Sequence, residues 1–137
     1  MRSQGGQAMV ELALTALVLV LFGLGLLAVG HVVGEYMAVR AAASQAALAA
    51  ARAPNAAAAQ TAARPAADQA VASSQVRDLR LDLDTAGFQR GATLTATASG
   101  CVSLEPFAIV SSVLGRCVPL RWTAHALVEP YRSRSAP

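Results

Sequence analysis

Few side chains in this chain have types and positions that suggest chemistry. Glu11 stands at the head of an apolar run from Leu12 to Gly34. The other reactive or ligating candidates are two cysteines and two histidines: Cys101, Cys117, His31 and His125. A carboxylate beside hydrocarbon is costly unless it is paired, so an ionisable group at the end of a membrane helix is usually placed for a reason. The first question is therefore what partners Glu11.

The remaining candidates do not form a catalytic pattern. The sequence has no nucleophile elbow, no glycine-rich phosphate loop and no CxxC pair. Asp82 and Asp84 alternate along an expected strand as solvated charges do, and His125 lies on a polar strand face. His31, near the outer end of the apolar run, is expected to extend toward a membrane interface. We expect no enzyme, no cofactor and no metal site.

The apolar run is long enough to cross a membrane. As a helix it rises about 35 Å, and a hydrocarbon core is about 30 Å thick. A secretory signal peptide has a shorter apolar stretch and a small-residue cleavage site. We therefore predict a retained membrane span over residues 12–34. Gly30 and Gly34 form a GxxxG pair, which lets helix backbones approach closely in lipid, so they are candidate helix-packing residues.

The helical pattern continues past the span. Alanine has the best helix propensity, and we predict one helix from about Gln7 to Arg52, ended by Pro54. Asn55 is expected to cap a second helix that runs to about Ser74.

Both predicted helices are poor in bulky side chains, so their faces allow close approach to another helix or sheet, and such surfaces suit packing between subunits. Pro65 is expected to kink the second helix or to split it at Arg64.

From Val76 onward, apolar and polar residues alternate with the period of a strand. Three such runs, around 79–83, 93–99 and 118–128, predict an antiparallel meander. The expected fold class is α+β: a long N-terminal transmembrane helix, a second Ala-rich helix and a small three-stranded antiparallel β meander.

Parity places Cys101 and Cys117 on the polar faces of the second and third strands, so they are compatible with a cross-strand disulfide. The register drawn from that pairing sets Thr97 opposite Arg121 and Thr93 opposite His125. Closing a loop of about 15 residues contributes about 3 kcal/mol in the chain-entropy model.

A cysteine pair suits an oxidising compartment, which places the C-terminal domain outside the cytoplasm. The count of basic residues does not support this orientation, because Arg2 precedes the span whereas Arg40 and Arg52 follow it.

The segment between the cysteines is unusually apolar for a loop. Pro106 and Gly115 suit the start and stop of a short helix, on which Phe107, Val110 and Leu114 share a face. That face either covers the sheet or forms a contact patch for another subunit or for the membrane surface.

The net charge of +3 comes from eleven arginines that form no basic run, so no nucleic acid is expected as a partner.

The opening of the chain resembles a type IV prepilin. The segment Gly6-Gln7-Ala8-Met9-Val10-Glu11 has the leader glycine and the carboxylate at the fifth mature position. The resemblance implies that a prepilin peptidase cuts between Gly6 and Gln7. It also implies that Glu11 pairs with a terminal amine, its own or a neighbour's, and so sets the register of assembly.

The chain as a whole is similar to TadE-like and TadG-like minor pilins, or pseudopilins, of tight-adherence (Flp) pilus systems. The similarity rests on that opening, on the Ala-rich stretch 49–53 and on the final strand 123–132. Major Flp pilins usually have an aromatic residue after the Glu. Leu12 in that place, together with the large domain, favours a minor subunit.

The resemblance implies three parts: a leader over 1–6, a pilin helix over 7–53 and an extracytoplasmic α+β domain over 54–137. It implies a structural subunit, anchored by a single pass in the inner membrane and assembled into an extracellular pilus for adhesion or surface attachment. Its partners would be the prepilin peptidase, the major Flp pilin and other minor pilins, the assembly platform with its ATPase, and membrane lipid. The alternative is a membrane-anchored or secreted binding module unrelated to a pilus.

Overall fold

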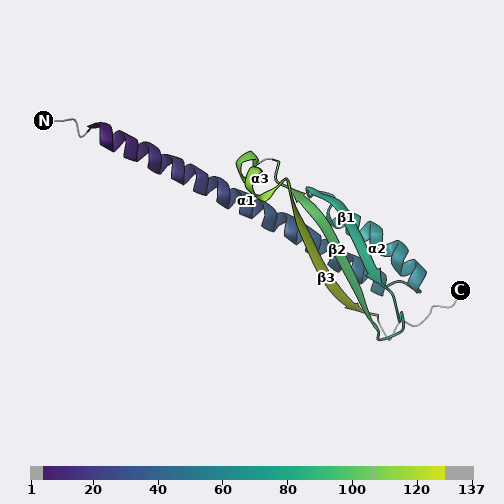
Figure 1. Ribbon diagram of the computed structural model, residues 1–137. Coiled ribbons are helices and arrows are strands. Elements are labelled where there is room, and N and C mark those ends of the chain that lie inside the picture. The colour runs from purple at the N-terminus through teal and green to yellow at the C-terminus, as the bar shows by residue number, and fades with distance from the viewer. Residues whose placement is uncertain (1–4, 106, 129–137) are drawn as a thin grey trace.

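The computed structural model describes residues 5–105 and 107–128. Its elements are α1 (Gly5–Ala51), α2 (Ala56–Ala70), β1 (Val76–Asp84), β2 (Thr93–Ser103), α3 (Ala108–Leu114) and β3 (Cys117–Leu127). This is the α+β arrangement predicted from the sequence. The two long helices lie on one side of a three-stranded sheet, and the N-terminal half of α1 projects beyond it (Figure 1). Three expected features lie outside the described residues: leader positions 1–4, Pro106 and the last strand after Val128.

The first helix is continuous over 47 residues, and its ends lie close to those predicted. Its second half is dominated by alanine, which favours the helix without side-chain entropy cost. The helix stops shortly before Pro54, as expected for a residue that cannot continue the hydrogen-bonding pattern.

The second helix begins at the predicted cap, where the Asn55 Oδ1 accepts a hydrogen bond of 2.8 Å from the Ala58 N–H. The predicted split at Arg64 is wrong: the helix passes through Pro65 and ends at Ala70. Pro65 is on the exposed side, where water can satisfy the carbonyl that loses its donor.

A continuous α2 also places three alanines on one buried face. Ala59, Ala63 and Ala67 recur every fourth residue and are fully buried. Burying all three together favours the unbroken helix.

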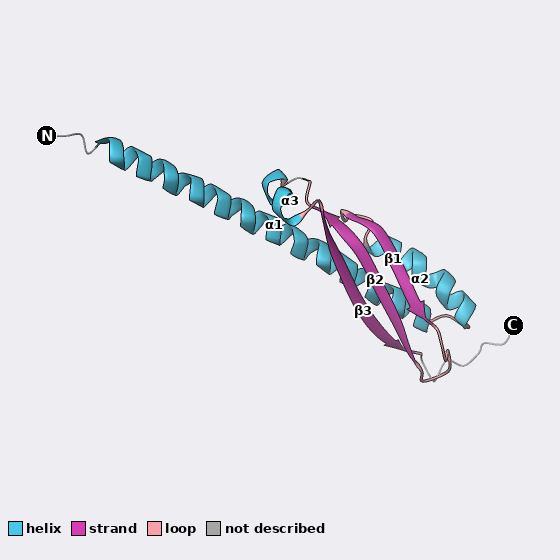
Figure 2. Cartoon of the chain, in the orientation of Figure 1, coloured by secondary structure: helices cyan, strands magenta, loops and turns pink. Residues whose placement is uncertain are grey.

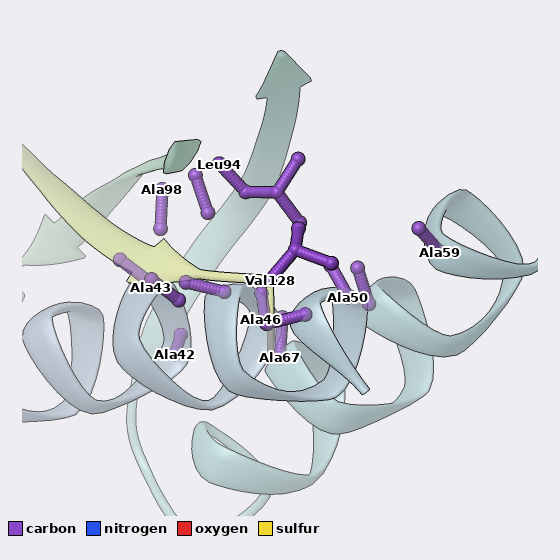
Figure 3. Close-up of a cluster of buried hydrophobic side chains, with 14 of the residues drawn as sticks. Ala42, Ala43, Ala46, Ala50, Ala59, Ala67, Leu94, Ala98 and Val128 are labelled. Atoms are coloured by element: carbon purple, nitrogen blue, oxygen red, sulfur yellow. The ribbon is translucent and has the colours of Figure 1, made fainter. Parts of the chain in front are cut away.

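Alanine side chains make most of the core. Val39 and the alanines of the second half of α1 pack with the alanines of α2 and with Leu94, Ala96 and Ala98 of the sheet. Figure 3 shows how closely these small side chains bring the helix backbones together. The predicted close approach of the Ala-rich faces to another helix or sheet is confirmed, but it occurs within the chain rather than between subunits.

The sheet has the order β1-β2-β3, with both pairs antiparallel (Figure 2). The predicted alternation is confirmed: Leu94, Ala96 and Ala98 of β2 are buried against the helices, while Thr95, Thr97 and Ser99 face outward.

The predicted strand register is shifted by two residues. Thr97 lies opposite Thr123 and Thr95 opposite His125, rather than opposite Arg121 and Thr123. The Thr97 and Thr123 hydroxyls lie 3.0 Å apart, and the Thr95 hydroxyl lies 3.1 Å from Nδ1 of His125. The alternation of residues predicts the face of the sheet on which each side chain lies, but it does not predict which residue lies opposite on the next strand.

The disulfide joins Cys101 to Cys117 across this register. Cys101 lies opposite Pro119, and Cys117 lies opposite Ser103, so the cysteines are diagonal neighbours on one face. Their Cα atoms are 5.7 Å apart, within the usual range for a disulfide. The predicted pairing and face are confirmed, and only the directly opposed geometry is corrected.

A β-bulge interrupts β1 where two residues, Asp78 and Leu79, face Gly100 alone. Asp78 has a φ of 55°, a conformation that occurs at bulges and strongly increases local twist. A Cβ at Gly100 would collide with the Val76 side chain, so this position requires glycine.

Candidate functional site in the first helix

The N-terminal half of α1 is left uncovered by the rest of the chain. Its large apolar side chains, from Met9 to Val29, point into open space. Only 6% of the most apolar 18-residue window is buried, whereas the core helix of a soluble protein would be mostly buried. By length and composition this helix can cross a membrane, as predicted.

Glu11 lies on this uncovered surface. Among the described residues, no donor or cation contacts its carboxylate. The nearby Thr15 hydroxyl is satisfied, because it donates a 2.8 Å hydrogen bond to the Glu11 backbone carbonyl. The Glu11 carboxylate is thus a charged group in this stretch for which the described residues supply no partner.

The predicted cleavage bond, Gly6–Gln7, lies in the first turn of α1. The space beside the Gly6 Cα is open, with no atom within 4 Å of a Cβ built there. Gln7 and Glu11 are four residues apart and share one helical face. An amine created at Gln7 would therefore lie one turn from the carboxylate.

The glycine pair Gly30 and Gly34 also faces open space, since a Cβ at either position would meet no atom within 4 Å. No element in the described part of the chain uses the close approach that the pair permits. The packing of a helix from another molecule against Gly30 and Gly34 stays a prediction.

His31 marks the junction between the uncovered helix and the domain. Its ring packs against Phe107 with centroids 5.7 Å apart. Its Nε2 is buried and has no hydrogen-bond partner among the described residues. The His31 ring therefore packs against the segment that leads into α3 instead of extending away from the protein.

The domain is fixed to α1 just beyond this junction by a group of residues that sequence reasoning missed. Trp122 of β3 meets Tyr36 edge to face at 5.6 Å, and the Arg40 guanidinium lies 5.1 Å from its ring centroid. Tyr36 and Arg40 are one helical turn apart, a spacing that could have suggested a shared partner. Nothing in the sequence pointed to Trp122.

One polar contact adds to this attachment. The carboxylate of Glu35 accepts a 3.0 Å hydrogen bond from the Gln75 N–H, at the point where the chain leaves α2 for β1. Together, these contacts attach the start of β1 and the middle of β3 to one stretch of α1.

Comparison with known families gives a match that covers most of α1. A family model described as TadE-like protein matches residues 6–48, which begin at the predicted leader glycine and end within α1. The resemblance to TadE-like proteins is thereby confirmed for this segment, whereas the stretches 49–53 and 123–132 lie outside the match. No curated protein and no solved structure matches the chain.

Proposed function

Because a family model of TadE-like proteins matches residues 6–48 of this chain, we propose that it is a minor pilin, or pseudopilin, of a tight-adherence pilus. In this proposal a prepilin peptidase removes residues 1–6, and the subunit enters the filament through the uncovered half of α1. Its role is structural rather than catalytic, in support of adhesion or surface attachment.

The observation that carries the proposal is the unpaired carboxylate on an uncovered apolar helix. Removing a charge from water without a partner costs several kcal/mol in real proteins. A terminal amine, created at Gln7 or supplied by a neighbouring subunit, offsets that cost. Because the pairing works at one axial position, it fixes how far one helix is shifted relative to the next.

The disulfide supports a domain outside the cytoplasm, since Cys101 and Cys117 are joined as an oxidising compartment allows. With one span and an external domain, the subunit sits in the inner membrane before assembly. Its partners are then the peptidase, the major Flp pilin, other minor pilins, the assembly platform with its ATPase, and lipid.

A charge-removal experiment tests the role of Glu11. Glu11→Gln keeps the side-chain shape and removes the charge, and we expect it to abolish incorporation into pili while the disulfide-bonded domain accumulates normally. The matched control is Glu35→Gln on the same helix, because its amide oxygen can still accept from Gln75. Normal incorporation of the Glu11→Gln subunit contradicts the proposal and favours the anchored module unrelated to a pilus.

N-terminal sequencing tests the processing step. We expect the mature chain to begin at Gln7 and Gly6→Phe to remain uncut, because a bulky side chain now precedes the bond. A mature chain that begins elsewhere removes the basis for a pilin assignment.

A further inference from the structure

We propose that α3 and its flanking residues, 107–115, form a second membrane contact that seats on the outer lipid surface beside α1. The proposal rests on the membrane span proposed above, but it needs no pilus. The occupant of this surface is the lipid bilayer rather than another protein.

The position of α3 along the helix sets its depth. The rise from Glu11 to His31 is about 30 Å, which equals the thickness of a hydrocarbon core. With Glu11 at one boundary, His31 lies at the other. Phe107 packs on His31, so the segment that leads into α3 is held at the level where the helix leaves the hydrocarbon.

The figures show the same placement. α3 lies at the end of the sheet that is nearest the uncovered half of α1 (Figures 1 and 2). Burial along α1 also begins near this level, since Ala28, one turn before His31, is the first buried residue of the described helix. The segment is thus continuous with the apolar surface that the proposed span presents to lipid.

The exposed residues of α3 are of the kind that suits the boundary between the hydrocarbon core and the lipid headgroups. Ile109 is 60% exposed at the surface of the helix, next to the exposed Ala108. No ionisable residue occurs between Glu105 and Arg116. Among the described residues outside α1, the other large exposed apolar side chain is Leu127, at the opposite end of β3.

The two serines of α3 do not oppose burial. The Ser111 hydroxyl donates to the Ala108 carbonyl at 3.0 Å, and the Ser112 hydroxyl donates to the Ile109 carbonyl at 2.7 Å. A hydroxyl that is hydrogen-bonded within its own helix loses much less on leaving water than a free one.

Charged side chains lie on both sides of α3 in the sequence. Arg77 and Glu105 form an exposed ion pair of 3.3 Å on the sheet side, and the exposed Arg116 follows the helix. These residues remain in water or among headgroups while the apolar face enters the boundary to a depth of about 5–10 Å, as an interfacial helix does.

The test is the depth of a tryptophan placed on this surface. The full chain is reconstituted in phosphatidylcholine vesicles with and without bromine on carbons 6 and 7 of one acyl chain, and wild type gives the Trp122 baseline. We expect the added emission of Ile109→Trp to be quenched about twofold or more by brominated lipid, given that insertion depth. Ala108→Trp repeats the measurement if the first variant does not fold.

The matched control is Leu127→Trp, an exposed aliphatic position of similar accessibility, 66%, at the far end of β3. It lies about 30 Å from α3 along the strand and should show no added quenching. Equal quenching at 109 and 127 overturns the proposal, and so does a blue shift at 109 without quenching, which indicates a protein partner.

A third variant, Leu19→Trp in the middle of the proposed span, separates the two hypotheses. If Leu19→Trp is quenched but Ile109→Trp is not, the span stands and the second contact fails. If neither is quenched, the span itself is wrong, and the second contact falls with it.

Discussion

The two halves of α1 are both apolar, yet they relate to the rest of the chain in opposite ways. The first half, up to Val33, carries leucine, valine and phenylalanine and exposes nearly all of them. The second half, from Val39, carries mainly alanine and buries one face completely. Along α1, the large apolar side chains are mostly exposed, and most of the buried side chains are alanines.

The difference shows that side-chain size is matched to the intended neighbour. Alanine loses no rotamer freedom on burial and lets two helices and a sheet approach closely, so many short contacts replace a few large side chains. Large side chains on the first half would be a liability in water, because an exposed apolar surface of this extent marks a membrane or protein contact.

The largest difference between the two halves of α1 is expected when arginines are introduced into each of them. Leu17→Arg combined with Leu21→Arg should prevent membrane insertion, at a cost of about 2.5–3.5 kcal/mol for each arginine at the centre of a span. Met37→Arg with Leu48→Arg is the matched pair beyond the proposed span, at positions that are also exposed. Carbonate extraction of membranes should release the first double variant and retain the second. Equal retention of the two would mean that the first half is not a span.

An enlargement of one small side chain tests the second half. Ala46 is fully buried between α1, α2 and the sheet (Figure 3). Ala46→Leu should lower the free energy of unfolding of the domain by about 1–3 kcal/mol through overpacking. Ala16→Leu, the same change in the exposed half, should leave it unchanged. Denaturation of the full chain in micelles, followed by Trp122 fluorescence, measures both, and equal values would remove the distinction between the halves.

A smaller effect tests how α2 is held against the second half. Asn55→Ala removes the cap of α2 and should lower the free energy of unfolding by about 1 kcal/mol. Asn55→Asp, which keeps the accepting oxygen, should stay close to wild type in the same measurement. A loss as large for Asp as for Ala would show that the hydrogen bond to Ala58 is not what stabilises the start of the helix.

Local rules predicted much of this fold. The alanine run gave the length of α1, Asn55 gave the start of α2, and the strict alternation around Leu81 gave the faces of the sheet. Each of these features depends on residues close together in sequence, where propensity, capping and side-chain period act directly.

Features that depend on distant residues were missed or misplaced. Parity put Cys101 and Cys117 on one face, but a shift of two residues leaves every face unchanged, so the register was wrong. Pro65 was judged by its local cost, which the burial of Ala63 and Ala67 outweighs. The contact between His31 and Phe107 joins residues far apart in the chain, and no local sequence pattern predicts it.

For the candidate site, the family resemblance found the opening segment, and the structure added its surroundings. The position of Glu11 on an uncovered surface could be inferred from the apolar run. The attachment of Trp122 to Tyr36 and Arg40 could not, because it depends on which strand face meets which turn of the helix.

The continuity of α1 has a mechanical consequence. A rod of 47 residues is about 70 Å long, and the described chain has no break between Glu11 and Ala51. The sheet and α2 are attached to that rod through Glu35 and Trp122, close to the end of its uncovered half. Torque or axial force applied to the N-terminal half is therefore transmitted to the domain as rigid motion, with no hinge along the helix to absorb it.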